Sequence, residues 1–153
     1  MLSKLTVAFA ALLGVVAAVP PGGSTLPSTL IISVVDASGA VLGTLNGYGN
    51  FSSPGPSYPY RAYPTTDEYA RITAYNRCSA SDVLACGGGT DGSFYQLGGN
   101  VVLDGTDGTW SVDARTDAAG GVDAFGRPYG IPVHVGSSAG AIPVTLRARA
   151  ASG

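Results

Sequence analysis

The sequence predicts an all-β fold, a small β-sandwich or barrel of about eight short antiparallel strands with one disulfide. Three observations indicate this class. Short runs rich in β-branched and aromatic residues alternate with turn residues along the chain. The 23 glycines and 10 prolines among 153 residues disfavour long helices. No segment carries a convincing apolar stripe of helical period, and at this length we expect a single domain.

The N-terminal residues have the composition of a targeting segment. Lys4 is followed by an uncharged apolar run, and small residues precede Ala18. This pattern predicts a signal peptide over residues 1–18 and a secreted protein, extracellular or in the cell wall. The run is shorter than the roughly 20 residues of a membrane span, so we expect no membrane partner. Residues 19–28 are predicted to be a flexible leader, and residues 29–150 a single β-domain.

The first strands are predicted from β-branched runs. Residues 29–36 and residues 41–45 flank a glycine-containing turn, so we expect a hairpin. Residues 58–63 are rich in tyrosine but contain Pro59, which favours an edge strand or an extended loop.

The next segment fits two structures. Thr65 and Glu68 have the spacing of a helix start, whereas residues 69–75 alternate in a period of two with aromatic and β-branched side chains. The alternation favours a strand.

Five further strands are predicted in the second half. Two Asp-Gly pairs each stand shortly before an aromatic residue, which is typical of a turn that opens a strand. Residues 114–130 are predicted to form a long loop. The strands are the successive meander strands 94–97, 101–103 and 110–112, and then 131–135 and 142–149, which a Gly/Ser segment joins.

Cys78 and Cys86 are the two cysteines. In a secreted protein an even number of cysteines suggests a disulfide, and two cysteines allow only one pairing. The bridge would close a short loop and stabilise the fold by about 2–3 kcal/mol. A metal site is less well supported, because there is one histidine and no C-x-x-C spacing.

Charge excludes one class of partner. The net charge is −2, and only 12% of the residues are charged. Phosphate recognition needs clustered lysine and arginine, so we expect no nucleic-acid partner. We also expect no cofactor and no metal, and a monomer.

One motif resembles the nucleophile elbow of α/β-hydrolases. Residues 136–140 match G-x-S-x-G with Ser138 at the centre, but an elbow needs a helix after the serine. Pro143 and its β-branched neighbours exclude that helix. His134, the only histidine, precedes the serine, which reverses the α/β-hydrolase order. We therefore interpret the segment as a hairpin loop and His134 as a surface residue.

The aspartates are explained by turns. A glycosidase needs two carboxylates across a cleft, and nothing in their spacing selects a pair. Asp104 and Asp107 could contribute to a weak calcium site, although the ligand order of an EF-hand is missing.

Tyrosines are the better candidates for binding. Tyr58, Tyr60 and Tyr63 cluster in sequence, and exposed tyrosines give rigid contact area with a polar tip, suited to sugars or protein partners. The alternative is that they pack in the core or along an edge strand. Asn50 begins an N-glycosylation sequon in a Gly/Pro/Ser-rich loop and predicts a glycan there.

Three motifs suggest a family. The Tyr/Thr-rich strand at residues 69–75 leads to Cys78, Cys86 begins a Cys-Gly-Gly-Gly segment, and Phe-Tyr-Gln-Leu at residues 94–97 is followed by Gly-rich turns. This part of the chain resembles small fungal secreted domains similar to the non-catalytic C-terminal domain of fungal T2-type ribonucleases. The resemblance implies an all-β accessory module without nuclease activity, and it carries over no catalytic residue.

The combined expectation is a secreted non-enzymatic β-domain that binds cell-wall polysaccharide or, as an effector-like factor, an extracellular protein partner. Two alternatives stay open. One is a small secreted carbohydrate-active hydrolase that uses paired aspartates, and the other is a structural cell-wall protein. A cleft holding two carboxylates would favour the hydrolase.

Overall fold

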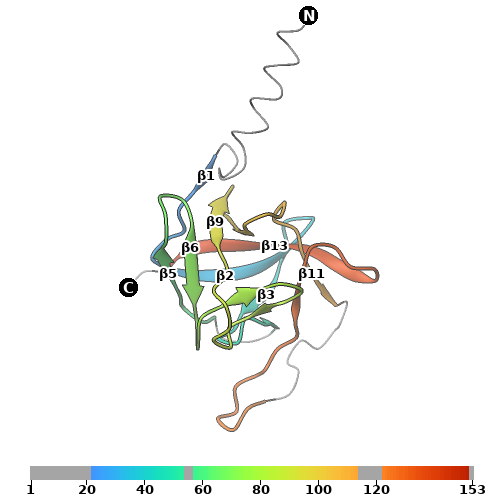
Figure 1. Ribbon diagram of the computed structural model, residues 1–153. Coiled ribbons are helices and arrows are strands. Elements are labelled where there is room, and N and C mark those ends of the chain that lie inside the picture. Colours follow the sequence, from blue (N-terminus) through green and yellow to red (C-terminus); the bar gives the residue numbers. More distant parts are fainter. Residues whose placement is uncertain (1–21, 54–56, 114–121, 152–153) are drawn as a thin grey trace, which may run out of the picture.

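The computed structural model describes residues 22–53, 57–113 and 122–151. These residues form an all-β structure of antiparallel strands with one disulfide, which confirms the predicted fold class (Figure 1). The described segments contain no helix that is long and apolar enough to cross a membrane. The predicted signal peptide, residues 1–18, lies outside the described residues.

The described residues hold 13 strands, more than the expected eight, because four are only two residues long. The strands are β1 (Gly23–Ser24), β2 (Thr29–Asp36), β3 (Val41–Leu45), β4 (Phe51–Ser52), β5 (Tyr60–Pro64), β6 (Ala70–Thr73), β7 (Ser79–Ala80), β8 (Leu84–Ala85), β9 (Phe94–Leu97), β10 (Asn100–Leu103), β11 (Trp110–Asp113), β12 (Val133–Val135) and β13 (Ala141–Ala150).

Strands β2 and β13 form the central pair of the fold. They are hydrogen bonded over seven residue pairs, from Val144 opposite Asp36 to Ala150 opposite Leu30. In Figure 1 they run side by side across the middle of the molecule, and β6 and β9 cross in front of them. The pairings β2–β5, β5–β6, β6–β9, β9–β10 and β10–β13 then return to the central pair, so six strands close into a barrel.

The other end of the central pair carries a second group of strands. β3 pairs with β2 and with β4, and β11 pairs with β13 and with β12. A bridge between Phe51 and Ile131 joins the two flanks. This end supports the loops that form the candidate site.

One hydrophobic core extends through the barrel and through the second group of strands. Along β2, the side chains of Leu30, Ile32 and Val34 are fully buried, while the residues between them are partly exposed. This period-two pattern follows from the pleat of a strand. Each fully buried side chain of this size contributes roughly 1.5–3 kcal/mol through its removal from water. Trp110 joins the core, and its indole nitrogen donates a hydrogen bond to the Val101 carbonyl oxygen at 3.2 Å.

Several predicted elements are confirmed. The β2 and β3 strands have the predicted bounds and form the predicted hairpin. The ambiguous segment forms a strand, β6, as its alternation indicated. The disulfide between Cys78 and Cys86 forms, both sulfurs are buried, and the loop it closes folds into the small β7–β8 hairpin.

The strand neighbours differ from the predicted meander. β9 and β10 pair, but β11 pairs with β13 and β12 instead of β10. The reason is that β13 has ten residues, so one of its edges accommodates both β10 and β11. β12 and β13 are therefore not a hairpin, because β11 lies between them. β5 is not an edge strand either, since Pro59 precedes it and leaves both of its edges to β2 and β6.

The predicted flexible leader needs a correction in its described part. Gly23 and Ser24 form β1 and pair with Leu97 and Gln96 of β9. Leu26 is only 4% exposed and belongs to the core. Burial of this one apolar side chain fixes a segment whose Pro/Gly/Ser content suggested mobility.

Candidate functional site

The three tyrosines of the predicted binding site do not share an exposed face. Tyr60 is fully buried, and its phenol donates a hydrogen bond to the Asn46 carbonyl oxygen, so its assignment as a binding residue is wrong. Tyr63 is 41% exposed. The two lie three residues apart on β5, and such residues point to opposite sides of a strand. Tyr58, which precedes β5, lines a pocket.

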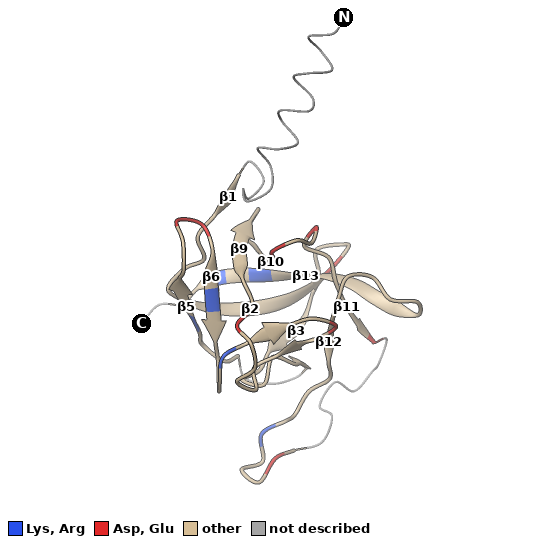
Figure 2. Ribbon diagram, viewed as in Figure 1, with Lys and Arg blue, Asp and Glu red and all other residues tan. Residues whose placement is uncertain are grey.

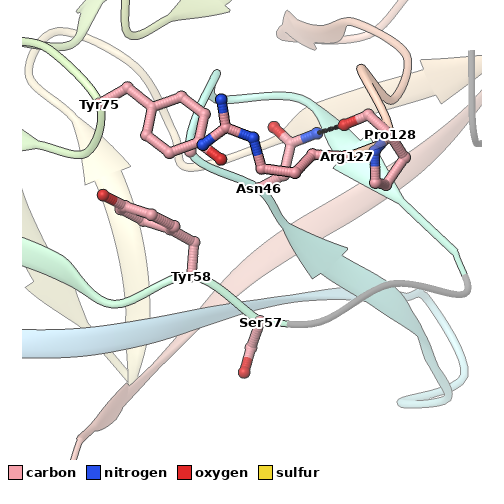
Figure 3. Close-up of a pocket in the computed structure, with 7 residues that line it drawn as sticks. Asn46, Ser57, Tyr58, Tyr75, Arg127 and Pro128 are labelled. Carbon is pink, nitrogen blue, oxygen red and sulfur yellow. Dashed lines mark hydrogen bonds between the residues drawn. The ribbon is translucent and has the colours of Figure 1, made fainter. Parts of the chain in front are cut away.

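A pocket of about 240 Å³ lies beside the β3–β4 turn. It is smaller than the roughly 300–1,000 Å³ of pockets for drug-sized ligands, and it suits a single sugar ring or a short side chain. Figure 3 shows the rings of Tyr58 and Tyr75 next to each other and the guanidinium of Arg127 over Tyr75. We call this the tyrosine pocket; its lining residues are Asn46, Gly47, Ser57, Tyr58, Tyr75, Arg127 and Pro128.

The aromatic rings around the pocket pack edge to face. The ring centroids of Tyr58 and Tyr75 are 4.7 Å apart, and those of Tyr48 and Tyr75 are 4.9 Å apart. Tyr129 extends the cluster at 5.5 Å from Tyr48. The two edge-to-face pairs each add about 0.5–1.5 kcal/mol beyond the area they bury, so they stabilise the arrangement of the rings.

A short hairpin at residues 122–128 forms one wall of the pocket. Val122 bridges to Pro128, and the Asp123 amide donates a hydrogen bond to the Arg127 carbonyl oxygen at 2.8 Å. The Arg127 guanidinium lies 4.6 Å from the centre of the Tyr75 ring, within the range of a cation–π contact. The hairpin therefore brings a positive charge onto the aromatic wall.

Asp123 holds this hairpin against the tyrosines. Its Oδ1 accepts hydrogen bonds from the backbone amides of Phe125, at 2.8 Å, and Arg127, at 3.0 Å. Its Oδ2 accepts hydrogen bonds from the Tyr48 phenol, at 2.8 Å, and from Nε of Arg127, at 2.7 Å. Four donors thus converge on one carboxylate and fix the direction of the arginine.

These contacts shift three pKa values. Burial alone would raise the pKa of Asp123, but the hydrogen bonds from the Arg127 amide, the Tyr48 phenol, the Phe125 amide and the Arg127 guanidinium outweigh it and lower that pKa to about 2. The same carboxylate raises the pKa of Tyr48 through their hydrogen bond, and raises the pKa of Arg127. The ion pair therefore stays charged at neutral pH.

Asn46 connects the β3–β4 turn to the hairpin. Its Nδ2 donates hydrogen bonds to the carbonyl oxygens of Pro128, at 3.0 Å, and Tyr129, at 2.9 Å. Its Oδ1 accepts hydrogen bonds from the amides of Tyr48, at 3.0 Å, and Asn50, at 3.2 Å. Because the Oδ1 and Nδ2 atoms of Asn46 already have hydrogen-bond partners, Asn46 shapes the pocket. Contacts with a ligand would come from the neighbouring residues.

Gly47 lets a tyrosine ring lie directly on the backbone. A Cβ atom at this position would lie 2.4 Å from Cε1 of Tyr75, closer than real Cβ contacts come. The Tyr75 amide also donates a hydrogen bond to the Gly47 carbonyl oxygen at 3.0 Å. A side chain at residue 47 would therefore push the Tyr75 ring out of its place in the pocket wall.

The predicted glycosylation site lies next to this pocket. Asn50 is partly exposed, and its Nδ2 donates a hydrogen bond to the Tyr129 carbonyl oxygen at 2.9 Å. The following residues, Phe51 and Ser52, are buried in β4. Glycosylation at Asn50 stays a prediction.

The other candidate chemical groups lie apart from the pocket. Residues 136–140 lead into strand β13, so no helix follows Ser138. His134 is partly exposed and lies 3.7 Å from Asp113. The Asp107 carboxylate accepts a hydrogen bond from the Thr109 amide at 2.9 Å, as a turn residue does. Within the described part of the chain, no three His, Cys, Asp or Glu side chains come close enough to hold a metal ion.

The site includes residues that the sequence pattern does not indicate. The pattern predicts a strand at Tyr75, whereas Tyr75 lines the pocket and Tyr48 and Tyr129 pack beside it. Arg127 and Asp123 fall in the predicted long loop. The one local signal was the Asp123–Gly126 spacing, which is typical of a turn and predicts a hairpin.

The comparisons with known proteins identify no relative. No family model, no curated protein and no solved structure matches this chain. The resemblance to the C-terminal domain of fungal ribonucleases stays a prediction. The chemistry of the tyrosine pocket therefore carries the functional proposal.

Proposed function

We propose that this protein is a secreted, non-catalytic β-domain that binds cell-wall polysaccharide and holds one sugar ring in the tyrosine pocket. The observation that carries the proposal is the pair of Tyr58 and Tyr75 rings beside the Arg127 guanidinium. Sugars present apolar C–H faces that pack on aromatic rings, and hydroxyl groups that accept hydrogen bonds from a guanidinium. The disulfide is compatible with an extracellular location.

The pocket is arranged before a ligand arrives. Asp123 binds Nε of Arg127, which leaves the two terminal nitrogens of the guanidinium for hydrogen bonds. Asn46 and Gly47 fix the turn on which Tyr75 rests. A preorganised site loses less conformational entropy on binding, so a small contact area can give useful affinity.

The turn contacts of one carboxylate, Asp36, are compatible with the non-enzymatic part of the proposal. Asp36 accepts hydrogen bonds from the Ser38 amide, the Ser38 hydroxyl and the Ala40 amide. These contacts lower the pKa of Asp36, the Ser38 hydroxyl contributing most. A carboxylate that is held ionised in a turn is unlike the general acid of a glycosidase, whose pKa is raised.

A pull-down with insoluble polysaccharide tests the proposal. The full chain is mixed with chitin, β-glucan or a cell-wall fraction, and the bound protein is measured after sedimentation. We expect Tyr58→Ala and Tyr75→Ala each to weaken binding about tenfold, while the control Tyr63→Ala binds like the original protein. Equal binding by Tyr58→Ala, or a loss confined to Tyr63→Ala, would refute the pocket as the site.

A protein partner is the second candidate, and one feature of the hairpin favours it. Phe125 is 82% exposed at the hairpin tip, Val122 is 60% exposed and Tyr129 is 44% exposed. Adjacent exposed apolar side chains mark many protein interaction sites. Loss of a protein partner by Phe125→Ala, with polysaccharide binding unchanged, would favour this function.

A further inference from the structure

Positive and negative charges occupy different parts of the fold. Figure 2 shows acidic residues in turns and at strand ends, and basic residues on strands β6 and β13. Four of the described arginines lie within strands: Arg61 on β5, Arg71 on β6, and Arg147 and Arg149 on β13. The barrel wall therefore carries positive charge although the whole chain is acidic.

Three of these arginines share one outer surface. The β2–β13 register places Arg147 opposite Ser33 and Arg149 opposite Ile31, and the β2–β5 register places Arg61 opposite Thr29. The residues that alternate with them, Leu30, Ile32, Tyr60 and Leu146, are fully buried, so the arginines point outward. We call Arg61, Arg147 and Arg149, with Thr29, Ile31 and Ser33 between them, the arginine face.

The charges of the arginine face have no carboxylate partner in the described segments. The arginines that form ion pairs in these segments are Arg77, with Asp91, and Arg127, with Asp123, and both of these arginines lie in loops. Arg61, Arg147 and Arg149 are all exposed. Arg147 and Arg149 are two residues apart on one strand, which separates them by about 7 Å.

The neighbouring side chains add uncharged hydrogen-bonding groups. Ser33 and Thr29 lie on β2, between the arginines of β13 and of β5. Asn100 of β10 pairs with Arg147 across the other edge of β13. Each of these three side chains is partly exposed. A guanidinium binds a carboxylate through two parallel hydrogen bonds, while hydroxyl and amide groups match sugar hydroxyls.

We propose that the arginine face binds an acidic polysaccharide, a polymer whose sugar units carry carboxylates. Such a chain presents spaced carboxylates among hydroxyl groups, which corresponds to the mixture of arginine, hydroxyl and amide groups on β13, β2, β5 and β10. A nucleic acid carries a much denser charge, one per about 1.7 Å of duplex, which three arginines among uncharged side chains do not match. This site is separate from the tyrosine pocket and does not depend on the function proposed for it.

Binding of polygalacturonate to the full chain tests this site. Affinity is measured by calorimetry at low and moderate salt, with a fully methyl-esterified polymer as the uncharged probe. We expect Arg147→Gln together with Arg149→Gln to weaken binding at least about tenfold and to flatten its salt dependence. The matched control Arg77→Gln, at an arginine that is paired with Asp91, should leave the affinity unchanged.

The outcomes separate this inference from the function of the pocket. Unchanged affinity in the double variant, or equal binding of the esterified polymer, would overturn it. Tighter binding of single-stranded DNA or of anionic lipid vesicles than of polygalacturonate would also overturn it. If Tyr58→Ala abolished polygalacturonate binding and the arginine variants did not, the acidic chain would bind in the tyrosine pocket, and the arginine face would have no such role.

Discussion

The phenol of Tyr48 donates a hydrogen bond to the carboxylate of Asp123 at 2.8 Å, across 75 residues of sequence. This contact joins the β3–β4 turn to the 122–128 hairpin. Each of these two loops forms one side of the tyrosine pocket. The pocket is therefore a product of tertiary structure, and this contact joins its two halves together with the hydrogen bonds from Asn46 to Pro128 and Tyr129.

Replacement of Tyr48 by phenylalanine tests this dependence. Tyr48→Phe keeps the ring and its packing on Tyr75 but removes one of the four donors to Asp123. We expect the amides of residues 123–127 to exchange hydrogen faster, with little change in the amides of β2 and β13. Hydrogen exchange measured by NMR would show this difference. Uniform exchange rates in the two proteins would mean that the hairpin is held by other contacts.

The pH dependence of stability gives a second prediction. The pKa of Asp123 is about 2 in the folded protein, and an unfolded aspartate has a pKa of about 3.9. Because the folded value is the lower one, the stabilising contribution is complete above about pH 4 and is lost as the pH falls toward 2.

We therefore expect Asp123→Asn to be less stable than the original protein at neutral pH and to approach it in stability near pH 2. Urea unfolding from pH 7 to pH 2 measures this. Two curves that stay parallel over the whole range would show that the carboxylate contributes nothing.

A third prediction concerns Tyr60, which the structure removes from the binding site. Tyr60→Phe leaves the Asn46 carbonyl oxygen without its donor and should lower the free energy of unfolding by about 1–2 kcal/mol. Tyr60→Ala creates a cavity in the barrel and should cost about 3–5 kcal/mol. Chemical denaturation followed by the fluorescence of the buried Trp110 reports both changes. A Tyr60→Ala protein of normal stability would contradict the core position.

The longer strands of the fold were predictable because each carries its own pattern, whereas the two-residue strands β1, β4, β7 and β8 carry none. The alternation in residues 29–36 and 69–75 reflects burial of one face of each strand. Because this pattern involves only neighbouring residues, it can be recognised in the sequence. Strand order was not predictable in the same way. Nothing local in residues 110–113 indicates that they pair with β13 instead of with β10, because the length of β13 decides it.

The site was predictable only in part. Proximity in sequence suggested Tyr58, Tyr60 and Tyr63, but the strand period separates Tyr60 from Tyr63, and this could have been recognised from their spacing. The partners that complete the pocket, such as Tyr75 and Arg127, come from distant segments. Their meeting depends on the closure of the sheet, for which the sequence carries no short-range signal.

The disulfide gives a fourth prediction. The backbone amide of Cys86 donates a hydrogen bond to the Tyr48 carbonyl oxygen at 2.9 Å, so the bridged loop supports the pocket. Replacement of both Cys78 and Cys86 by alanine should lower the free energy of unfolding by about 2–3 kcal/mol. Thermal denaturation of the double variant checks this. A stability equal to that of the original protein would show that the β7–β8 hairpin is stable without the disulfide.

The most direct test of the central claim is an NMR titration of the full chain with soluble chitin and β-glucan oligosaccharides. If the tyrosine pocket holds a sugar ring, the largest shift changes will occur at Tyr58, Tyr75 and Arg127, and Tyr58→Ala will require about tenfold more oligosaccharide to produce them. Shift changes confined to other surfaces, or none with any of these oligosaccharides at millimolar concentration, would contradict the account.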